Sequence, residues 1–170
     1  MRNRALLVAA SLAVLVCRPA AGSDYLVYVS NERSGNISVI DPDDHKVIAT
    51  IAAGKRPRGI HCSADGRKLY VAVSGSPRVA PGVDHDRTGA DKSADGIAAI
   101  DTVAKRLLGK IPAGSDPEQF AILRDDRRAV ISNEDKGTAS VVDLKSGEVI
   151  GEVKVSDEPE GVGISWRLHH

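Results

Sequence analysis

The stretch VYVSNERSGNISVIDPDDHKVIATIAAGKRPRGIHCSADG, Val27–Gly66, is one copy of a repeat that runs through most of the chain. Later copies keep its landmarks, which are an aspartate at positions 41, 101 and 143 and a proline at positions 57, 117 and 159. In both series the first interval is 60 residues and the second is 42. The unit is therefore 42 residues long, and its middle copy carries 18 extra residues after Tyr70. A self-similar period in the forties is typical of β-propellers and solenoids.

Each repeat contains four short runs rich in Val, Ile and Tyr, which Gly, Pro and Asp residues separate. None of the runs is long enough for an average helix, and none has a 3.6-residue apolar period. Four strands per repeat form one blade of a propeller. Because each blade packs between two neighbours, both faces of its strands should be apolar, as Val47-Ile48 and Val141-Val142 suggest.

The repeats predict an all-β fold with about three four-stranded blades. A first blade has only three strands, Tyr25–Ser30, Ile37–Asp41 and Val47–Ile51. Complete blades cover 59–111 and 119–155, and Glu160–Ser165 resembles the innermost strand of a fourth blade. Within a domain spanning 23–170, the repeats fall at about 25–66, 67–126 and 127–165.

Closed propellers typically contain about 4–8 blades, so about three blades predict a partial, open propeller. Such a chain exposes a blade face and strand edges, which favours association. The repeat is also lost abruptly at Trp166, where the expected Asp-Gly turn is absent. We therefore expect a truncated form of a longer protein. The alternative is a short protein that completes a ring by self-association through its exposed blade edges.

The repeat SVIDPDDHKVIATIAAGKRPRGIHCSADGRKLYVA resembles the YVTN-type, YncE-like β-propeller repeat of bacterial secreted proteins. The resemblance covers nearly all of residues 25–165. The segments SNE, RPRGI, DPEQF and EPEGV are similar to a subgroup of periplasmic propellers associated with quinoprotein-dependent oxidation. This resemblance implies a propeller fold and a periplasmic binding or interaction protein.

The N-terminal residues 1–22 read as a secretory signal peptide. Arg2 and Arg4 precede an apolar helix, Ala5–Val16, and small residues precede the expected cleavage before Ser23. The apolar run is too short to span a membrane, and no other span follows it. The mature protein should therefore be periplasmic or secreted, with lipidation at Cys17 as the alternative.

The composition argues against a nucleic-acid partner. Lys plus Arg equals Asp plus Glu at 23 each, and aromatic residues make up only 3% of the chain. A neutral chain has no long-range attraction to polyanions, and few aromatic residues disfavour base stacking. After cleavage, Cys62 is the only cysteine, and we expect it to be a buried residue of an innermost strand.

Polar residues from separate repeats should converge on one end of the blades. In a propeller, the loop before each innermost strand and the end of each second strand lie at the same end, which we call the top face. The predicted ligand-binding residues of the top face are Asn31, Glu32, Arg56, Arg58, Asp116, Glu118, Asn133, Glu134, Glu158 and Glu160. The alternative is a solvated charged rim. The insertion Gly75–Gly96 should also cover this end.

Metal ligands are suggested within the insertion, where Asp84, His85, Asp86 and Asp91 offer oxygen and nitrogen donors. A solvated loop explains the same residues. His61 should pack within an innermost strand. The sequence lacks a Ser-His-Asp order, a nucleophile elbow, HExxH and a phosphate loop. No organic cofactor is expected, although a divalent cation is compatible with these residues.

Three classes of function follow. The favoured class is a non-catalytic binding propeller whose partner is an unknown small molecule or periplasmic protein. The second is a propeller-lactonase-like hydrolase, because similar enzymes use a top-face acidic cluster, often around a divalent cation. The third is a redox accessory, because related propellers resemble the d-type haem domain of nitrite reductase, and it needs paired axial histidines. Fold alone does not choose among them.

Overall fold

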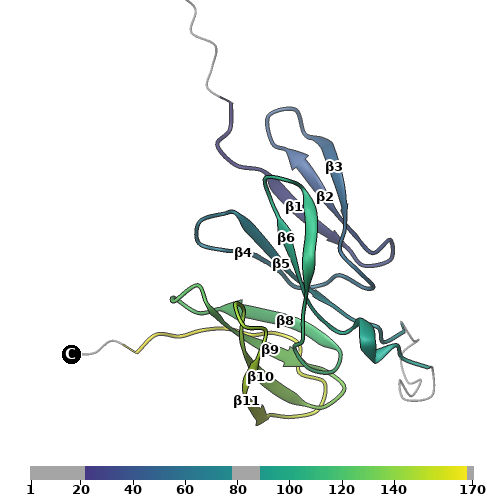
Figure 1. Cartoon of the computed structure of the whole chain (residues 1–170), viewed down its shortest axis with the longest axis vertical. Coiled ribbons are helices and arrows are strands. Elements are labelled where there is room, and N and C mark those ends of the chain that lie inside the picture. The colour runs from purple at the N-terminus through teal and green to yellow at the C-terminus, as the bar shows by residue number, and fades with distance from the viewer. Residues whose placement is uncertain (1–21, 78–88, 168–170) are drawn as a thin grey trace, which may run out of the picture.

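Three antiparallel β-sheets make up the computed structural model, which describes residues 22–77 and 89–167 (Figure 1). The first sheet contains β1 (Val27–Asn31), β2 (Asn36–Asp41) and β3 (Lys46–Ala52). The second contains β4 (Ile60–Cys62), β5 (Lys68–Val73), β6 (Gly96–Asp101) and β7 (Arg106–Ile111). The third contains β8 (Pro117–Ile122), β9 (Arg128–Asn133), β10 (Thr138–Asp143) and β11 (Val149–Lys154).

The strands of each sheet pair in chain order, so the structure confirms an all-β open propeller with two complete blades and a three-stranded first blade. Within the described residues the only helix is η2 (Lys92–Ala94), a single 3₁₀ turn. The described residues therefore contain no helix that is long and apolar enough to cross a bilayer. The expected signal helix, Ala5–Val16, lies outside the described residues.

The same turn closes β2–β3, β6–β7 and β10–β11. In each, an aspartate side chain accepts the backbone N–H two residues ahead at 2.9 Å, and these aspartates are Asp41, Asp101 and Asp143. Such an Asx turn is a local property of aspartate, so the residue itself specifies where the strand ends. A register shift also recurs at the equivalent place in β2, β6 and β10. The 42-residue repeat is thus a repeat of backbone geometry.

The second sheet lies between the first and the third (Figure 1), and the apolar core forms one layer on each side of it. Successive side chains of a strand point to opposite faces, and β5 uses both faces. Leu69, Val71 and Val73 pack toward the first sheet, whereas Tyr70 and Ala72 pack toward the third. The central strands of the second sheet, β5 and β6, are therefore buried on both sides, as the apolar strand patterns predicted.

The prediction of two-sided burial is wrong for the outermost strand of the first sheet. Val47 and Ile48 in β3 remain 59% and 46% exposed. Leu107 and Leu108 in β7 and Val149 in β11 are exposed in the same way. Blades diverge away from the propeller axis, so the outermost strands lie too far from the neighbouring sheets to be covered.

Cys62 is exposed, which corrects the expectation of a buried core residue. It lies at the end of β4, an edge strand of the second sheet, where one side of the side chain faces solvent. Partial burial nevertheless raises the pKa of the Cys62 thiol, so the thiolate is disfavoured. The blade pattern also predicts that Ile100, Val142 and Ile122 are buried. Ile100 and Val142 are wholly buried, whereas Ile122 is only half-buried.

The expected strand Glu160–Ser165 is absent, because the structure has no regular secondary structure there. A strand requires a partner that supplies backbone hydrogen bonds. Within residues 22–77 and 89–167 no second strand pairs with this segment. The sequence pattern identified the repeat position correctly but not the pairing on which a strand depends.

Burial of Val142 makes Val142→Asp a direct test of the core between the second and third sheets. An unpaired carboxylate at this fully buried site should lower the free energy of unfolding by roughly 4 kcal/mol. Urea unfolding followed by circular dichroism measures the change. Val153→Asp, at a site 60% exposed on β11, is the matched control and should cost less than about 1 kcal/mol. Equal midpoints for the two variants would refute the core assignment.

Candidate functional site

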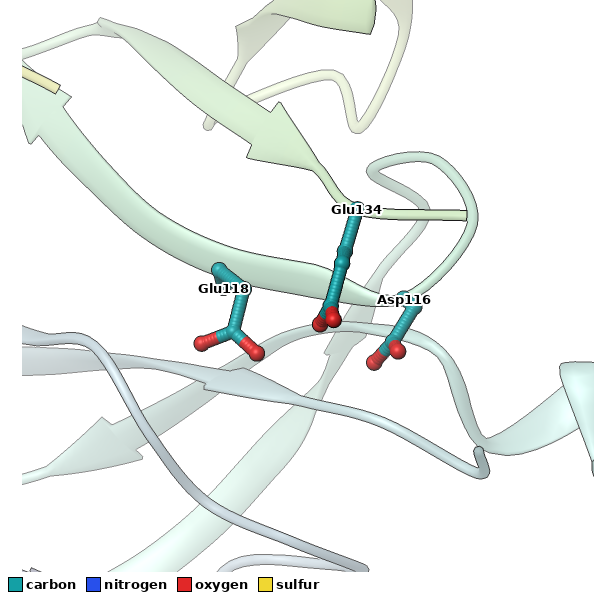
Figure 2. A group of neighbouring side chains, drawn as sticks. All are labelled: Asp116, Glu118 and Glu134. Carbon is teal, nitrogen blue, oxygen red and sulfur yellow. The ribbon is translucent and has the colours of Figure 1, made fainter. Parts of the chain in front are cut away.

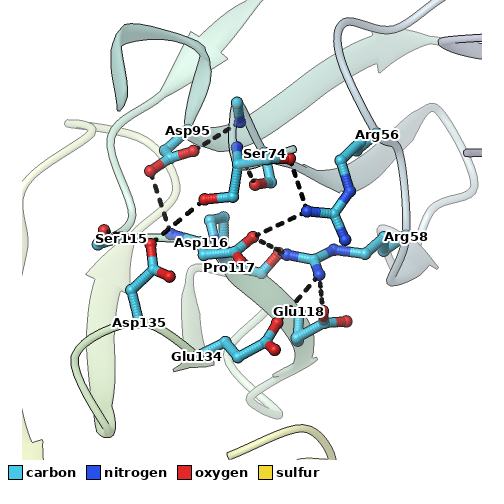
Figure 3. Close-up of polar contacts among 12 residues, drawn as sticks. Arg56, Arg58, Ser74, Asp95, Ser115, Asp116, Pro117, Glu118, Glu134 and Asp135 are labelled. Atoms are coloured by element: carbon cyan, nitrogen blue, oxygen red, sulfur yellow. Dashed lines mark hydrogen bonds and ion pairs between the residues drawn. The ribbon is translucent and has the colours of Figure 1, made fainter. Parts of the chain in front are cut away.

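Charged side chains gather on the top face, where the loops before the innermost strands meet the ends of the second strands (Figure 3). Arg56 and Arg58 come from the loop before β4. Asp116 directly precedes β8, Glu118 lies in its first residues, and Glu134 directly follows β9. The structure thus brings residues of the second and third sheets, far apart in sequence, into one cluster.

The backbone before each repeat proline has the same unusual conformation. Arg56, Asp116 and Glu158 have φ angles of 43°, 54° and 48°, in the left-handed region that non-glycine residues rarely adopt. Strain of this kind persists only where the surrounding structure holds it. Because this conformation recurs at the same repeat position, the backbone enters each proline in the same way. Arg58 and Glu118, the residues after two of these prolines, therefore lie at the same end of the blades.

Arg58 is the centre of the cluster. Its guanidinium forms ion pairs with Asp116 and Glu118, lies 3.3 Å from a carboxylate oxygen of Glu134, and donates a hydrogen bond of 2.9 Å to the carbonyl of Pro117. Only 8% of the side chain is exposed. Because Arg58 belongs to the second sheet and its partners to the third, these bonds join the two sheets.

Asp116 is completely buried and lies beside two arginines. One carboxylate oxygen accepts from Arg58 and lies 3.9 Å from the Arg56 guanidinium, whereas the other has no hydrogen-bond partner among residues 22–77 and 89–167. The backbone N–H of Asp116 donates to Asp95 at 3.1 Å. Burial lowers the pKa of Arg58, although the negative charges of Asp116 and Glu134 oppose this shift. An arginine remains protonated under all ordinary conditions, so the positive charge persists.

Three carboxyl groups, those of Asp116, Glu118 and Glu134, point into the same space (Figure 2). One oxygen of each lies within 4.8 Å of the other two, a spacing that oxygen ligands of a divalent cation could adopt. The guanidinium of Arg58 already contacts all three groups. The three carboxylates could therefore hold a cation only if Arg58 moved aside. In the observed arrangement, the guanidinium of Arg58 supplies the positive charge between them.

A hollow opens beside the cluster, between the first and second sheets. Its volume is about 640 Å³, and Glu32, Lys55, Arg56, Gly75 and Ser76 contribute to its lining. Arg56 forms an ion pair of 3.0 Å with Glu32 and donates to the carbonyl of Ser76 at 2.6 Å. Both charged side chains keep partial exposure, 18% for Arg56 and 32% for Glu32. The wall of the hollow thus carries both signs of charge.

Four residues of this region, Ser76, Lys92, Asp95 and Asp135, were missed by the sequence analysis. Lys92 forms an ion pair with Asp135, and Ser76 donates to the same carboxylate at 3.3 Å. Asp95 is nearly buried and accepts the N–H of Gly75 at 2.7 Å, which pins the base of the insertion. Lys92 and Asp95 belong to the part of the chain that has no counterpart in the other repeats, so the repeat alignment contained no signal for them.

The two predicted asparagines turn into their own sheets. The Asn133 amide is completely buried and donates to Thr138 at 3.2 Å and to Ser140 at 2.6 Å. Asn31 donates to Asn36 and Ser38 at equivalent positions of the first sheet, at 2.9 and 2.8 Å. In both places the amide braces the hairpin between two strands of one sheet.

The remaining predicted residues lie apart from the cluster. Glu158 and Glu160 are exposed beyond the end of the third sheet. Asp84, His85 and Asp86 lie outside the described residues. Asp91 forms an ion pair of 2.7 Å with Lys55, and this bond lowers the pKa of Asp91 to about 2.

The two described histidines occupy different parts of the fold. His45 lies in the turn between β2 and β3, whereas His61 lies on β4 and packs edge-on against Phe120, with ring centroids 4.8 Å apart. They therefore do not form a pair of the kind that axial haem ligation requires. Partial burial lowers the pKa of His61, because the charged imidazolium is poorly solvated there.

Removing the cation at the centre of the cluster should strongly destabilise the protein. Arg58→Ala leaves the buried Asp116 carboxylate without its main partner, and the expected loss of unfolding free energy is about 3–5 kcal/mol. Urea unfolding gives this value, with Arg106→Ala on the exposed strand β7 as control. Adding Asp116→Asn to Arg58→Ala should recover part of the loss. No recovery would show that the two charges are not coupled.

The lowered pKa of His61 predicts a pH dependence. The pKa of His61 in the folded state lies below the unfolded value of 6.5. The stability that comes from keeping this imidazole neutral is therefore fully present above pH 6.5, and it is lost as the pH falls through 6.5 toward the folded-state pKa. We expect His61→Gln to lose less stability than the parent chain between pH 8 and pH 5, measured by urea midpoints. If the urea midpoints of the two proteins fell equally between pH 8 and pH 5, the result would contradict this account.

Comparison with known proteins supports the fold. No protein-family model matches the sequence, and a search of curated proteins finds no significant relative. Solved structures do match. The chain is similar to hydrazine synthase of Kuenenia stuttgartiensis, with a TM-score of 0.63 and 26% identity over 77% of this chain and 34% of that one.

Two further structures share the fold at lower identity. Apo AztD from Citrobacter koseri gives a TM-score of 0.52 at 15% identity, over 74% of this chain and 31% of that one. A 6-phosphogluconolactonase candidate from Bacteroides fragilis gives 0.57 at 23% identity, over 81% and 38%. The chain spans about a third of the length of these proteins, and the likeness establishes a propeller fold without a specific function.

Proposed function

We propose that this chain is an exported, non-catalytic binding propeller of the YVTN type, whose top face takes a small ligand in the hollow beside Arg56 and Glu32. One observation carries the proposal: a hollow of about 640 Å³ opens where partly exposed groups of opposite charge lie 3.0 Å apart. Ligand sites are usually concave and contain a few polar groups that fix orientation. The export component rests on the N-terminal pattern of residues 1–22.

The mixture of charges selects the class of ligand. Arg56 and Lys55 can bind a carboxylate, and Glu32 can bind an ammonium group or share a bridging cation. A polyanion would be attracted by the first two residues and repelled by the third. The ligand expected from this arrangement is therefore zwitterionic, or anionic and bridged by a divalent cation. Arg58 holds the adjacent wall in place through its bonds to the third sheet.

Calorimetric titration with zwitterionic amino acids, with and without calcium chloride, tests this proposal. We expect at least one probe to bind, and Arg56→Gln or Glu32→Gln should weaken that binding at least tenfold, about 1.4 kcal/mol. Arg106→Gln is the matched control. Melting temperatures measured alongside separate lost binding from lost folding. If no probe binds, or if both site variants bind as the parent does, the proposal fails.

A second function is favoured by the three convergent carboxylates, namely hydrolysis of a lactone with a divalent cation. Asp116, Glu118 and Glu134 would then hold a cation that polarises the lactone carbonyl. This function requires Arg58 to leave the position in which it contacts all three. Lactone hydrolysis followed in a pH-stat, with calcium added and with Glu118→Gln as the variant, distinguishes the two functions. Turnover that depends on calcium and on Glu118 would favour the hydrolase.

A further inference from the structure

β1 presents one open edge. In the second and third sheets, the equivalent strands β5 and β9 pair on that side with the innermost strands β4 and β8. Within the described residues β1 pairs only with β2, and Val27 and Val29 are 38% and 41% exposed. An unpaired strand edge with apolar residues is a template for another strand.

The segment Glu160–Ile164 is the matching element. It stands 42 residues after Glu118–Ile122 of β8, so Glu160 is the repeat equivalent of Glu118 and Arg58. The structure holds it at the equivalent place. The Ser30 hydroxyl donates to the carbonyl of Arg58 at 2.9 Å, and the Ser132 hydroxyl donates to the carbonyl of Glu160 at 2.5 Å. Ser30 and Ser132 occupy the same repeat position, so the segment already lies against the third sheet as β4 lies against the first.

We propose that Glu160–Ile164 pairs with β1 of a second copy of this chain and completes its first sheet. Each copy would donate one strand and accept one. The hydrogen bond from Ser132 to the carbonyl of Glu160 would anchor the donated strand at its base, and the exposed Val27 and Val29 would pack under it. The donated strand would gain the backbone partners that it lacks in the single chain.

The repeat fixes the register of this pairing. In the second sheet Ile60 lies opposite Val71, and in the third Phe120 lies opposite Ile131. The residues at those repeat positions in the donated strand and in β1 are Val162 and Val29. The same rule places Ile164 opposite Val27. Both pairs are aliphatic, as expected for a strand that enters an apolar face.

The described sheets of two copies would form a ring of ordinary size. Three sheets from each copy give six blades, which lies in the usual range of about 4–8 for closed propellers. A head-to-tail contact that closes after two copies forms a ring instead of an open filament.

Charge makes a second, independent prediction for this seam. Inside the chain, Arg58 faces Glu118 across the sheets. At the next contact between blades, the position of Arg58 is occupied by Glu118 and the position of Glu118 by Glu160. Two carboxylates should therefore approach each other there. Both carboxylates belong to the donating chain, so their repulsion opposes the placement of Glu160–Ile164 and thereby opposes association. Salt screens this repulsion, so association should strengthen with ionic strength. Glu160→Arg should restore the opposite-charge arrangement and tighten the dimer at low salt.

Cysteine crosslinking tests the register. In a full chain carrying Cys17→Ser and Cys62→Ser, the pair Val29→Cys with Val162→Cys should form a covalent dimer under mild oxidation. The pair Val29→Cys with Val153→Cys, whose second site lies on β11, is the control and should stay monomeric on denaturing gels. Sedimentation velocity of the unaltered chain should show a dimer, more abundant at 0.5 M salt than at low salt.

Each alternative result overturns the proposal. A chain that sediments as a monomer up to 100 μM at both salt concentrations excludes this seam, whatever the variants do. Equal crosslinking of the two cysteine pairs would indicate association without register. A series of larger oligomers would show that the head-to-tail contact does not close, and that the two-copy ring is wrong.

Discussion

Face-to-face packing of neighbouring sheets is the interaction on which the rest of this structure depends. The central strands of the second sheet bury both of their faces, one against the first sheet and one against the third, and these two layers contain the apolar core of the described residues. No blade could bury its apolar faces alone, because a sheet of three or four strands has no second layer of its own. The inner strands are therefore well covered, whereas the outermost strands stay exposed.

The charged cluster follows from this packing. Sheets that stack face to face bring the loops at one end of each blade together, so Arg58 from the second sheet meets Asp116, Glu118 and Glu134 from the third. A buried carboxylate and a buried guanidinium are tolerated because they compensate each other. The same contact that holds the blades in register shapes the wall of the neighbouring hollow, which links stability of the scaffold to the proposed binding site.

Features that depend on local chemistry could be predicted from the sequence, because one repeat contains the information for them. The strands, the Asx turn after Asp41 and its copies, and the loops that present Arg58 and Glu118 belong to this group. Features that depend on neighbours could not be predicted in this way. Three features belong to this second group: the exposure of Cys62, the role of Asp95 and the missing strand at Glu160–Ser165. Each depends on whether a neighbouring sheet or strand packs against that part of the chain.

Hydrogen exchange of the dilute chain, followed by mass spectrometry of peptides, tests most directly whether blade-to-blade packing holds the structure. Amides of β5 and β6, which lie between two covered faces, should exchange most slowly and only through global unfolding. Amides of β2 and β10, each with one covered face, should exchange faster. Slower exchange in either flanking sheet than in the second sheet would contradict the account, because it would mean that a blade is stable without neighbours on both sides.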